Sequence, residues 1–179
     1  MTGWFVFLVY LAAVNPPRLR PRMGIGDERG RLAQLAIGTA TVAVAGLMLV
    51  LAADRILDAL DITDETWRLA AGAVGLLVGA RVVVTPRLGD MPVPDGPGLV
   101  PIAFPLLFTP QLAVLAILFG ATESFATAWG WLVVGVATAA ATARLRHRRP
   151  GLWLALARLL GAVLVALAIA LLIAGIRDV

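Results

Sequence analysis

Six apolar segments, separated by charged or proline-rich stretches, constrain the fold of this chain more than any other feature. They cover residues 2–14, 32–53, 67–85, 99–119, 125–143 and 152–175. A helix needs about 20 apolar residues to cross a hydrocarbon core about 30 Å thick. Lipid offers the backbone no hydrogen-bond partners, and these runs lack the alternation of a barrel strand. We therefore predict an all-α membrane protein with six transmembrane helices, of which the run at 2–14 is short for a full crossing.

The remaining composition narrows the function classes. The net charge of +4 comes from arginines in short stretches between apolar runs, where they orient a membrane protein, so we expect no nucleic-acid partner. The chain has no Cys and one His, His147, which lies in the basic stretch RLRHRRP. A disulfide framework, a thiolate metal site and a nucleophile–base pair are therefore not expected. We predict no enzymatic activity, no cofactor and no metal.

Arginine-rich connections alternate with arginine-poor ones. Residues 15–31 and 144–151 are rich in arginine, whereas residues 54–66 carry five acidic residues, Asp54, Asp58, Asp61, Asp64 and Glu65. Arginine-rich loops stay on the cytoplasmic side. With six spans, this alternation predicts a multi-pass membrane protein with both termini on the non-cytoplasmic side.

Two proline-bearing interruptions divide the chain into halves. Asn15-Pro16 ends the first apolar run, and Thr109-Pro110-Gln111 interrupts the fourth, 109 − 15 = 94 residues later. Three helices per half is an odd number, so the halves would cross the membrane in opposite directions, as the inverted repeats of many secondary transporters do. We predict one repeat at 1–85, a Pro/Gly-rich linker at 86–98 and a second repeat at 99–179, with helices 1 and 4 broken or kinked at proline.

The interruptions also predict a binding site. Proline has no N–H and therefore breaks the hydrogen-bond ladder of a helix, and paired breaks point to a site near the bilayer midplane. Free N–H groups at a helix start favour an anionic group. The candidate substrate-binding residues are Asn15, Pro16, Thr109, Pro110 and Gln111. The alternative is structural, because proline in a membrane helix often makes only a kink.

Two ionisable residues are further candidates, for coupling or gating. Glu123 is an isolated acid at a short turn, and Arg158 lies about one turn inside the sixth run. Coupling to a proton or another ion would use such groups. Arg158 could instead extend to the interface, and Glu123 could act as a helix N-terminal charge. The sequence leaves both alternatives open.

The order of four motifs resembles a known family. AAVNPPRLRP near the first helix, WRLAAGAVGLLVGARVVV in the third, LVPIAFPLLFTPQLAVL in the fourth and VALAIALLIAGI in the last are similar to stretches of the MarC-like inner-membrane proteins. This multiple-antibiotic-resistance-related family includes small six-helix exporters of neutral amino acids. The resemblance implies a six-helix fold in the bacterial inner membrane and transport of a small neutral or zwitterionic solute.

The sequence departs from the family pattern at both interruptions. Arg18, Arg20 and Arg22 follow the Asn-Pro pair, where the family is apolar, and the family's Gly-Pro-Gly is replaced by Thr109-Pro110-Gln111. The departures allow a different substrate or a loss of transport. Our hypothesis is a small-solute transporter or exporter that works by alternating access; the alternative is a non-transporting membrane scaffold or stress-response protein of the same fold. The sequence does not indicate an oligomeric state.

Overall fold

The protein is a bundle of helices. The computed structural model describes residues 3–18, 28–85, 108–143 and 150–178. In these residues the elements are α1 (Gly3–Val14), η1 (Pro16–Arg18), α2 (Glu28–Leu60), α3 (Asp64–Val84), α4 (Pro110–Thr122), α5 (Phe125–Ala143) and α6 (Pro150–Asp178). Four of the helices are long and apolar enough to cross a membrane, over Leu35–Leu60, Asp64–Val84, Phe125–Thr142 and Gly151–Asp178. The prediction of a helical, multi-pass membrane protein is confirmed at this level.

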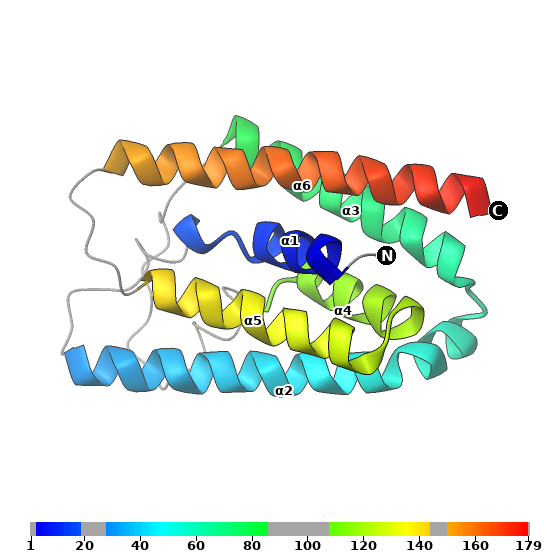
Figure 1. Cartoon of the computed structure of the whole chain (residues 1–179), viewed down its shortest axis with the longest axis horizontal. Helices are drawn as coiled ribbons and strands as arrows, with labels where there is room; N and C mark the ends of the chain where they lie inside the picture. The colour runs from blue at the N-terminus through cyan, green and yellow to red at the C-terminus, as the bar shows by residue number, and fades with distance from the viewer. Residues whose placement is uncertain (1–2, 19–27, 86–107, 144–149, 179) are drawn as a thin grey trace.

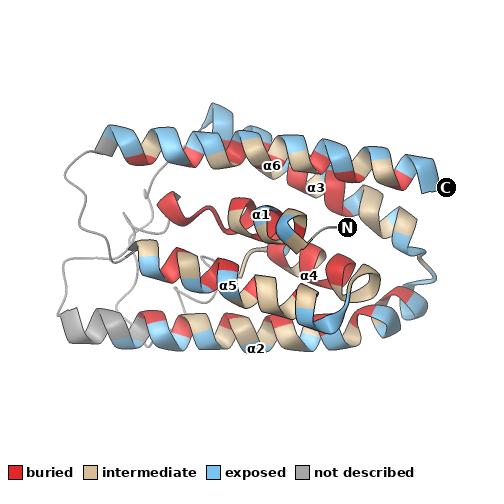
Figure 2. Ribbon diagram, in the orientation of Figure 1, coloured by how far each residue is buried: buried red, intermediate tan, exposed pale blue. Residues whose placement is uncertain are grey.

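The helices form a long bundle with the two short ones inside it. Figure 1 shows α3 and α6 along one side and α2 along the opposite side, with α1, α4 and α5 between them. The short helices are buried over most of their surfaces, and their residues Val6, Tyr10, Leu112 and Phe119 are fully covered (Figure 2). The long helices bury one face and expose apolar residues such as Leu77 and Ile173 on the other. An exposed apolar surface of this extent suits lipid contact.

The second helix is longer than the sequence predicted. We expected a loop over 54–66, but α2 continues to Leu60 and the connection to α3 is reduced to residues 61–63. The reason is packing: Ala53 and Leu57 are buried in a small cluster with Ile117 of α4, so the acidic stretch keeps a helical face with apolar contacts. Asp61, with a φ of 52°, ends the helix in a left-handed conformation that Asp tolerates better than most residues.

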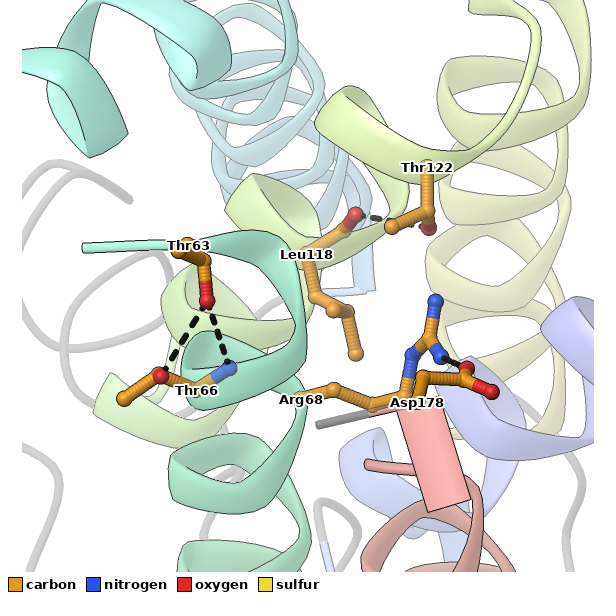
Figure 3. Close-up of polar contacts among 6 residues, drawn as sticks. All are labelled: Thr63, Thr66, Arg68, Leu118, Thr122 and Asp178. Atoms are coloured by element: carbon orange, nitrogen blue, oxygen red, sulfur yellow. Dashed lines mark hydrogen bonds and ion pairs between the residues drawn. The ribbon is translucent and has the colours of Figure 1, made fainter. Parts of the chain in front are cut away.

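Helix α3 begins with a side-chain cap. The Thr63 hydroxyl accepts a hydrogen bond from the Thr66 N–H at 3.4 Å (Figure 3). Nearby, Arg68 of α3 donates to the carboxylate of Asp178 at the end of α6 (Figure 3). This ion pair joins the start of α3 to the last turn of α6 and gives Arg68 a partner inside the protein.

Glycines allow α3 and α6 to approach closely. A Cβ built on Gly79 would lie 3.0 Å from the carbonyl oxygen of Gly161, and one built on Gly161 would lie 3.2 Å from the carbonyl oxygen of Gly79. Small residues at such contacts let membrane helices pack backbone to backbone. The two helices run in opposite directions along this contact (Figure 1).

Candidate functional site

Helix α1 ends at Asn15. This residue has a φ of 48°, and its N–H donates to the Leu11 carbonyl at 3.0 Å. One bond of this kind from a left-handed residue closes a helix C-terminus, and Asn adopts that conformation more readily than most residues. Pro16 and Pro17, both buried, then begin the 3₁₀ turn η1. The first predicted interruption is therefore a helix end in the structure.

The two prolines remove hydrogen-bond donors from the end of α1. In a continuous helix, the carbonyls of Ala12 and Ala13 would accept from the N–H groups of residues 16 and 17. Both of those residues are proline and have no N–H. Ala12 and Ala13 are 1% and 7% exposed, so water has little access to their carbonyls. The end of α1 thus holds two buried acceptors without their helical donors.

The side chain of Asn15 is held at one end and unpaired at the other. Its Nδ2 donates to the carbonyl of Ala157 on α6 at 3.0 Å. Its Oδ1 is buried and has no hydrogen-bond partner among the described residues. Asn15 is 2% exposed. The bond to α6 fixes the side chain, and the remaining oxygen is an acceptor available to a bound molecule.

Helix α4 begins at the second interruption. The Thr109 hydroxyl accepts from the Leu112 N–H at 3.2 Å, which makes Thr109 the N-cap, and Pro110 occupies the first helical position, where its missing N–H costs nothing. Thr109 is half-buried and Pro110 is exposed. Both residues are explained by helix initiation, so of the three predicted here Gln111 remains the candidate for binding.

Gln111 is buried without partners. It is 3% exposed, and neither its Nε2 nor its Oε1 has a hydrogen-bond partner among the described residues. Its backbone N–H lies in the first turn of α4, before the first intrahelical bond, which Ala113 donates to Thr109. Leaving a buried polar group unsatisfied costs about 1–3 kcal/mol, so such groups are rare in proteins and call for a physical reason.

The two helix ends lie at a similar depth in the bundle. Helices α1 and α4 contact each other and run in opposite directions, and both breaks fall near the middle of the bundle's long axis (Figure 1). The rings of Tyr10 and Phe119 meet edge to face with centroids 5.3 Å apart. Asn15 follows Tyr10 on α1, and Gln111 precedes Phe119 on α4, so both lie on the same side of this ring contact along the bundle axis. At about 1.5 Å per residue, they lie within roughly one to two helical turns of each other along that axis. Their neighbours Val14 and Leu112 belong to one hydrophobic cluster.

Tyr10 is a residue that the sequence reasoning missed. It is the only Tyr of the chain, it is fully buried one turn before Asn15, and its hydroxyl has no hydrogen-bond partner among the described residues. A Tyr hydroxyl can donate and accept. The sequence feature that could have identified Tyr10 is a single phenol within the apolar run that precedes Asn15-Pro16.

The candidates for coupling, Glu123 and Arg158, are not brought together. Glu123 caps the C-terminus of α4, where its N–H donates to the Phe119 carbonyl at 3.0 Å. Arg158 is exposed in the third turn of α6, a helix that starts at the opposite end of the bundle from the α4–α5 turn (Figure 1). The exposed position of Arg158 agrees with a side chain that extends to the interface.

An open groove lies at the acidic end of the bundle, away from the helix breaks. Its volume is ≈ 580 Å³, and it is lined by Asp54, Leu57, Asp58, Asp61, Ile62, Thr63, Asp64, Glu65 and Ala121. Within the described part of the chain, no three acidic or histidine side chains lie close enough to hold a metal ion. The groove is therefore a solvated surface between the α2–α3 and α4–α5 turns.

Comparison of the chain with known protein families, curated protein sequences and solved structures gives no match. The resemblance to the MarC-like proteins stays a prediction. Function must therefore be argued from the geometry of this chain, in which Tyr10, Asn15 and Gln111 carry buried, unpaired polar atoms near the neighbouring ends of α1 and α4.

Proposed function

We propose that the protein transports a small polar solute across the bacterial inner membrane by alternating access, with the solute bound between the end of α1 and the start of α4. The supporting observation is that Asn15 Oδ1 and both amide atoms of Gln111 are buried and unpaired at these two ends. A bound solute would supply the missing hydrogen bonds. Neutral amino acids are the substrate class that the family resemblance implies.

An inverted repeat would suit this mechanism, and we propose that the two halves are related in this way. Trp67, Ala71 and Gly75 of α3 are matched by Trp153, Ala157 and Gly161 of α6, each 86 residues later. The alanines and glycines of this set are buried, and the two helices run in opposite directions (Figure 1). In transporters built from inverted repeats, one half rocks against the other around a fixed site.

The orientation in the membrane is part of the proposal. The end of α6 and the turns α2–α3 and α4–α5 lie at one end of the bundle, and the start of α1 points toward that end (Figure 1). Acidic residues Asp54, Asp58, Asp61 and Asp64 gather there. The end of α5 and the start of α2, the helix termini next to the predicted arginine-rich connections, lie at the other end (Figure 1). The rule that arginine-rich loops stay inside then places both termini on the non-cytoplasmic side.

The test is solute flux through the purified protein in lipid vesicles loaded with isotope-labelled alanine. We expect Asn15→Gly to abolish flux, because glycine keeps the backbone conformation at φ 48° and removes only the amide. Gln111→Leu should also abolish flux while raising the free energy of unfolding by about 1 kcal/mol, since it removes a buried unsatisfied amide at similar volume.

Thr138→Ala is the matched control. The Thr138 hydroxyl donates to the Val134 carbonyl of its own helix, so its removal tests the loss of a polar group away from the breaks. This variant should keep wild-type flux. Wild-type flux in both Asn15→Gly and Gln111→Leu would rule out the site, and the scaffold alternative would then be favoured if the wild-type protein carries no polar solute.

A further inference from the structure

The two helix ends of the proposed site have opposite electrical character. Aligned peptide dipoles give a helix C-terminus a partial negative charge and an N-terminus a partial positive charge. Here α1 presents its C-terminus and α4 its N-terminus near the same level of the bundle (Figure 1). A molecule between them would therefore lie in a field that runs from one end to the other.

The unpaired side chains are compatible with this polarity. At the end of α1, Asn15 Oδ1 is an unpaired acceptor, and the Tyr10 hydroxyl one turn earlier can donate or accept. At the start of α4, Gln111 has an unpaired donor, Nε2, and an unpaired acceptor, Oε1. An ammonium group donates only, and a carboxylate accepts only. Asn15 Oδ1 can therefore accept from an ammonium group and Gln111 Nε2 can donate to a carboxylate, and the charges of the helix termini set the direction.

The side chains of α1 and α4 themselves carry no charge that could neutralise an ion. Residues 3–17 and 108–122 contain no Asp, Glu, Arg, Lys or His. An uncompensated charge buried at membrane depth is costly. A zwitterion has no net charge, and its two ends are each stabilised by one helix terminus, so it avoids this cost.

We propose that the solute binds in one orientation, with its ammonium group toward the end of α1 and its carboxylate toward Gln111 at the start of α4. This assignment rests on the proposed transport function and adds the direction in which the zwitterion lies. The unpaired side chains of Asn15 and Gln111, 2% and 3% exposed, carry it together with the helix ends.

The first experiment measures equilibrium binding to the full-length protein in detergent by titration calorimetry with three probes. Alanine has both charges, alaninamide lacks the carboxylate and propionate lacks the ammonium group. We expect alanine to bind about 10- to 100-fold more tightly than either of the other two, because each lacks one set of charge-assisted hydrogen bonds. Equal binding of all three would overturn the proposal.

The second experiment tests the direction. Gln111→Glu puts a carboxylate beside the proposed carboxylate subsite, so it should weaken alanine binding at least about tenfold and strengthen alaninamide binding. Asn15→Asp puts the same charge at the ammonium subsite and should retain alanine binding. Gln111→Leu, the uncharged control, should lose alanine affinity without gaining affinity for alaninamide. The reverse pattern, with Asn15→Asp losing alanine and Gln111→Glu keeping it, would overturn the orientation.

These outcomes separate the orientation from the transport function. If vesicles carry propionate or alaninamide as well as alanine, and the flux still depends on Asn15 and Gln111, the site stands and the orientation fails. If no probe is bound or carried, both proposals fail.

Discussion

Gly120 shows how closely a single residue can control the position of α4. A Cβ built on Gly120 would lie 2.8 Å from the carbonyl oxygen of Val50 and 2.9 Å from its Cα, both on the backbone of α2. Backbone atoms cannot move aside as a side chain can, so a side chain here would push α4 away from α2. Because Gln111 lies on the same helix, this contact also helps to place the proposed site.

We therefore predict that Gly120→Ala destabilises the protein by about 1–3 kcal/mol, the usual cost of overpacking a filled contact. Gly130→Ala is the control, since a Cβ at Gly130 would meet no atom within 4 Å. Both glycines are helical and gain the same helix propensity, so Gly130→Ala should be neutral or stabilising by about 0.5–1 kcal/mol. Thermal unfolding in detergent measures the difference; equal melting temperatures would contradict the packing argument.

At the scale of the element, the start of α4 depends on Thr109 and Pro110. The Thr109 hydroxyl caps the Leu112 N–H, and Pro110 is preorganised for the first helical position. These residues fix where the helix begins, and therefore where the N–H of Gln111 is left free. Thr63 performs the same capping role for α3, away from the helix breaks.

The two caps give a matched pair of variants. Thr109→Ala and Thr63→Ala should each lower the free energy of unfolding by about 1 kcal/mol through loss of a cap. Only Thr109→Ala should also lower alanine flux, because fraying of the first turn displaces Gln111. Thr109→Ser keeps a capping hydroxyl and should restore both properties. An equal loss of flux from Thr63→Ala would attribute the effect to stability alone.

At the scale of the whole molecule, the proposed orientation of the bundle in the membrane can be tested by cysteine labelling. The chain has no native Cys, and Asp61, Ser124 and Thr85 are exposed. Asp61 and Ser124 lie in turns at one end of the bundle, and Thr85 follows the end of α3 that points away from them (Figure 1).

In intact cells, Asp61→Cys and Ser124→Cys should react with a membrane-impermeant maleimide, and Thr85→Cys should react only after the membrane is opened. This follows from the proposal that the acidic end faces the non-cytoplasmic side. Labelling of Thr85→Cys alone would reverse the orientation. Labelling of Asp61→Cys and Ser124→Cys from opposite sides would contradict the arrangement of the bundle.

Much of the helical layout was predictable because apolar runs of sufficient length have few alternatives in lipid. The range 125–143 coincides with α5, and 67–85 and 152–175 agree with α3 and α6 to within three residues. The predicted end of α2 was wrong because the acidic residues after position 53 indicated a loop. In the structure Leu57 continues the buried face of the helix, and its packing against α4 stabilises the extra turns. The predicted linker at 86–98, the arginines at 20 and 22, and residues 99–107 of the fourth run lie outside the described residues.

The sequence by itself determined that this chain forms apolar helices, that α1 ends before Pro16 and that α4 begins at Pro110, because the hydropathy of a run and the missing N–H of proline are local properties. Only the tertiary structure decided which polar groups are left without partners. Thr109 and Gln111 are two residues apart, yet the Thr109 hydroxyl accepts a hydrogen bond from its own helix and the Gln111 amide is buried and unpaired. Asn15 is held by α6, 142 residues away in sequence. Such outcomes depend on which helix covers each side chain, and no local pattern encodes that packing.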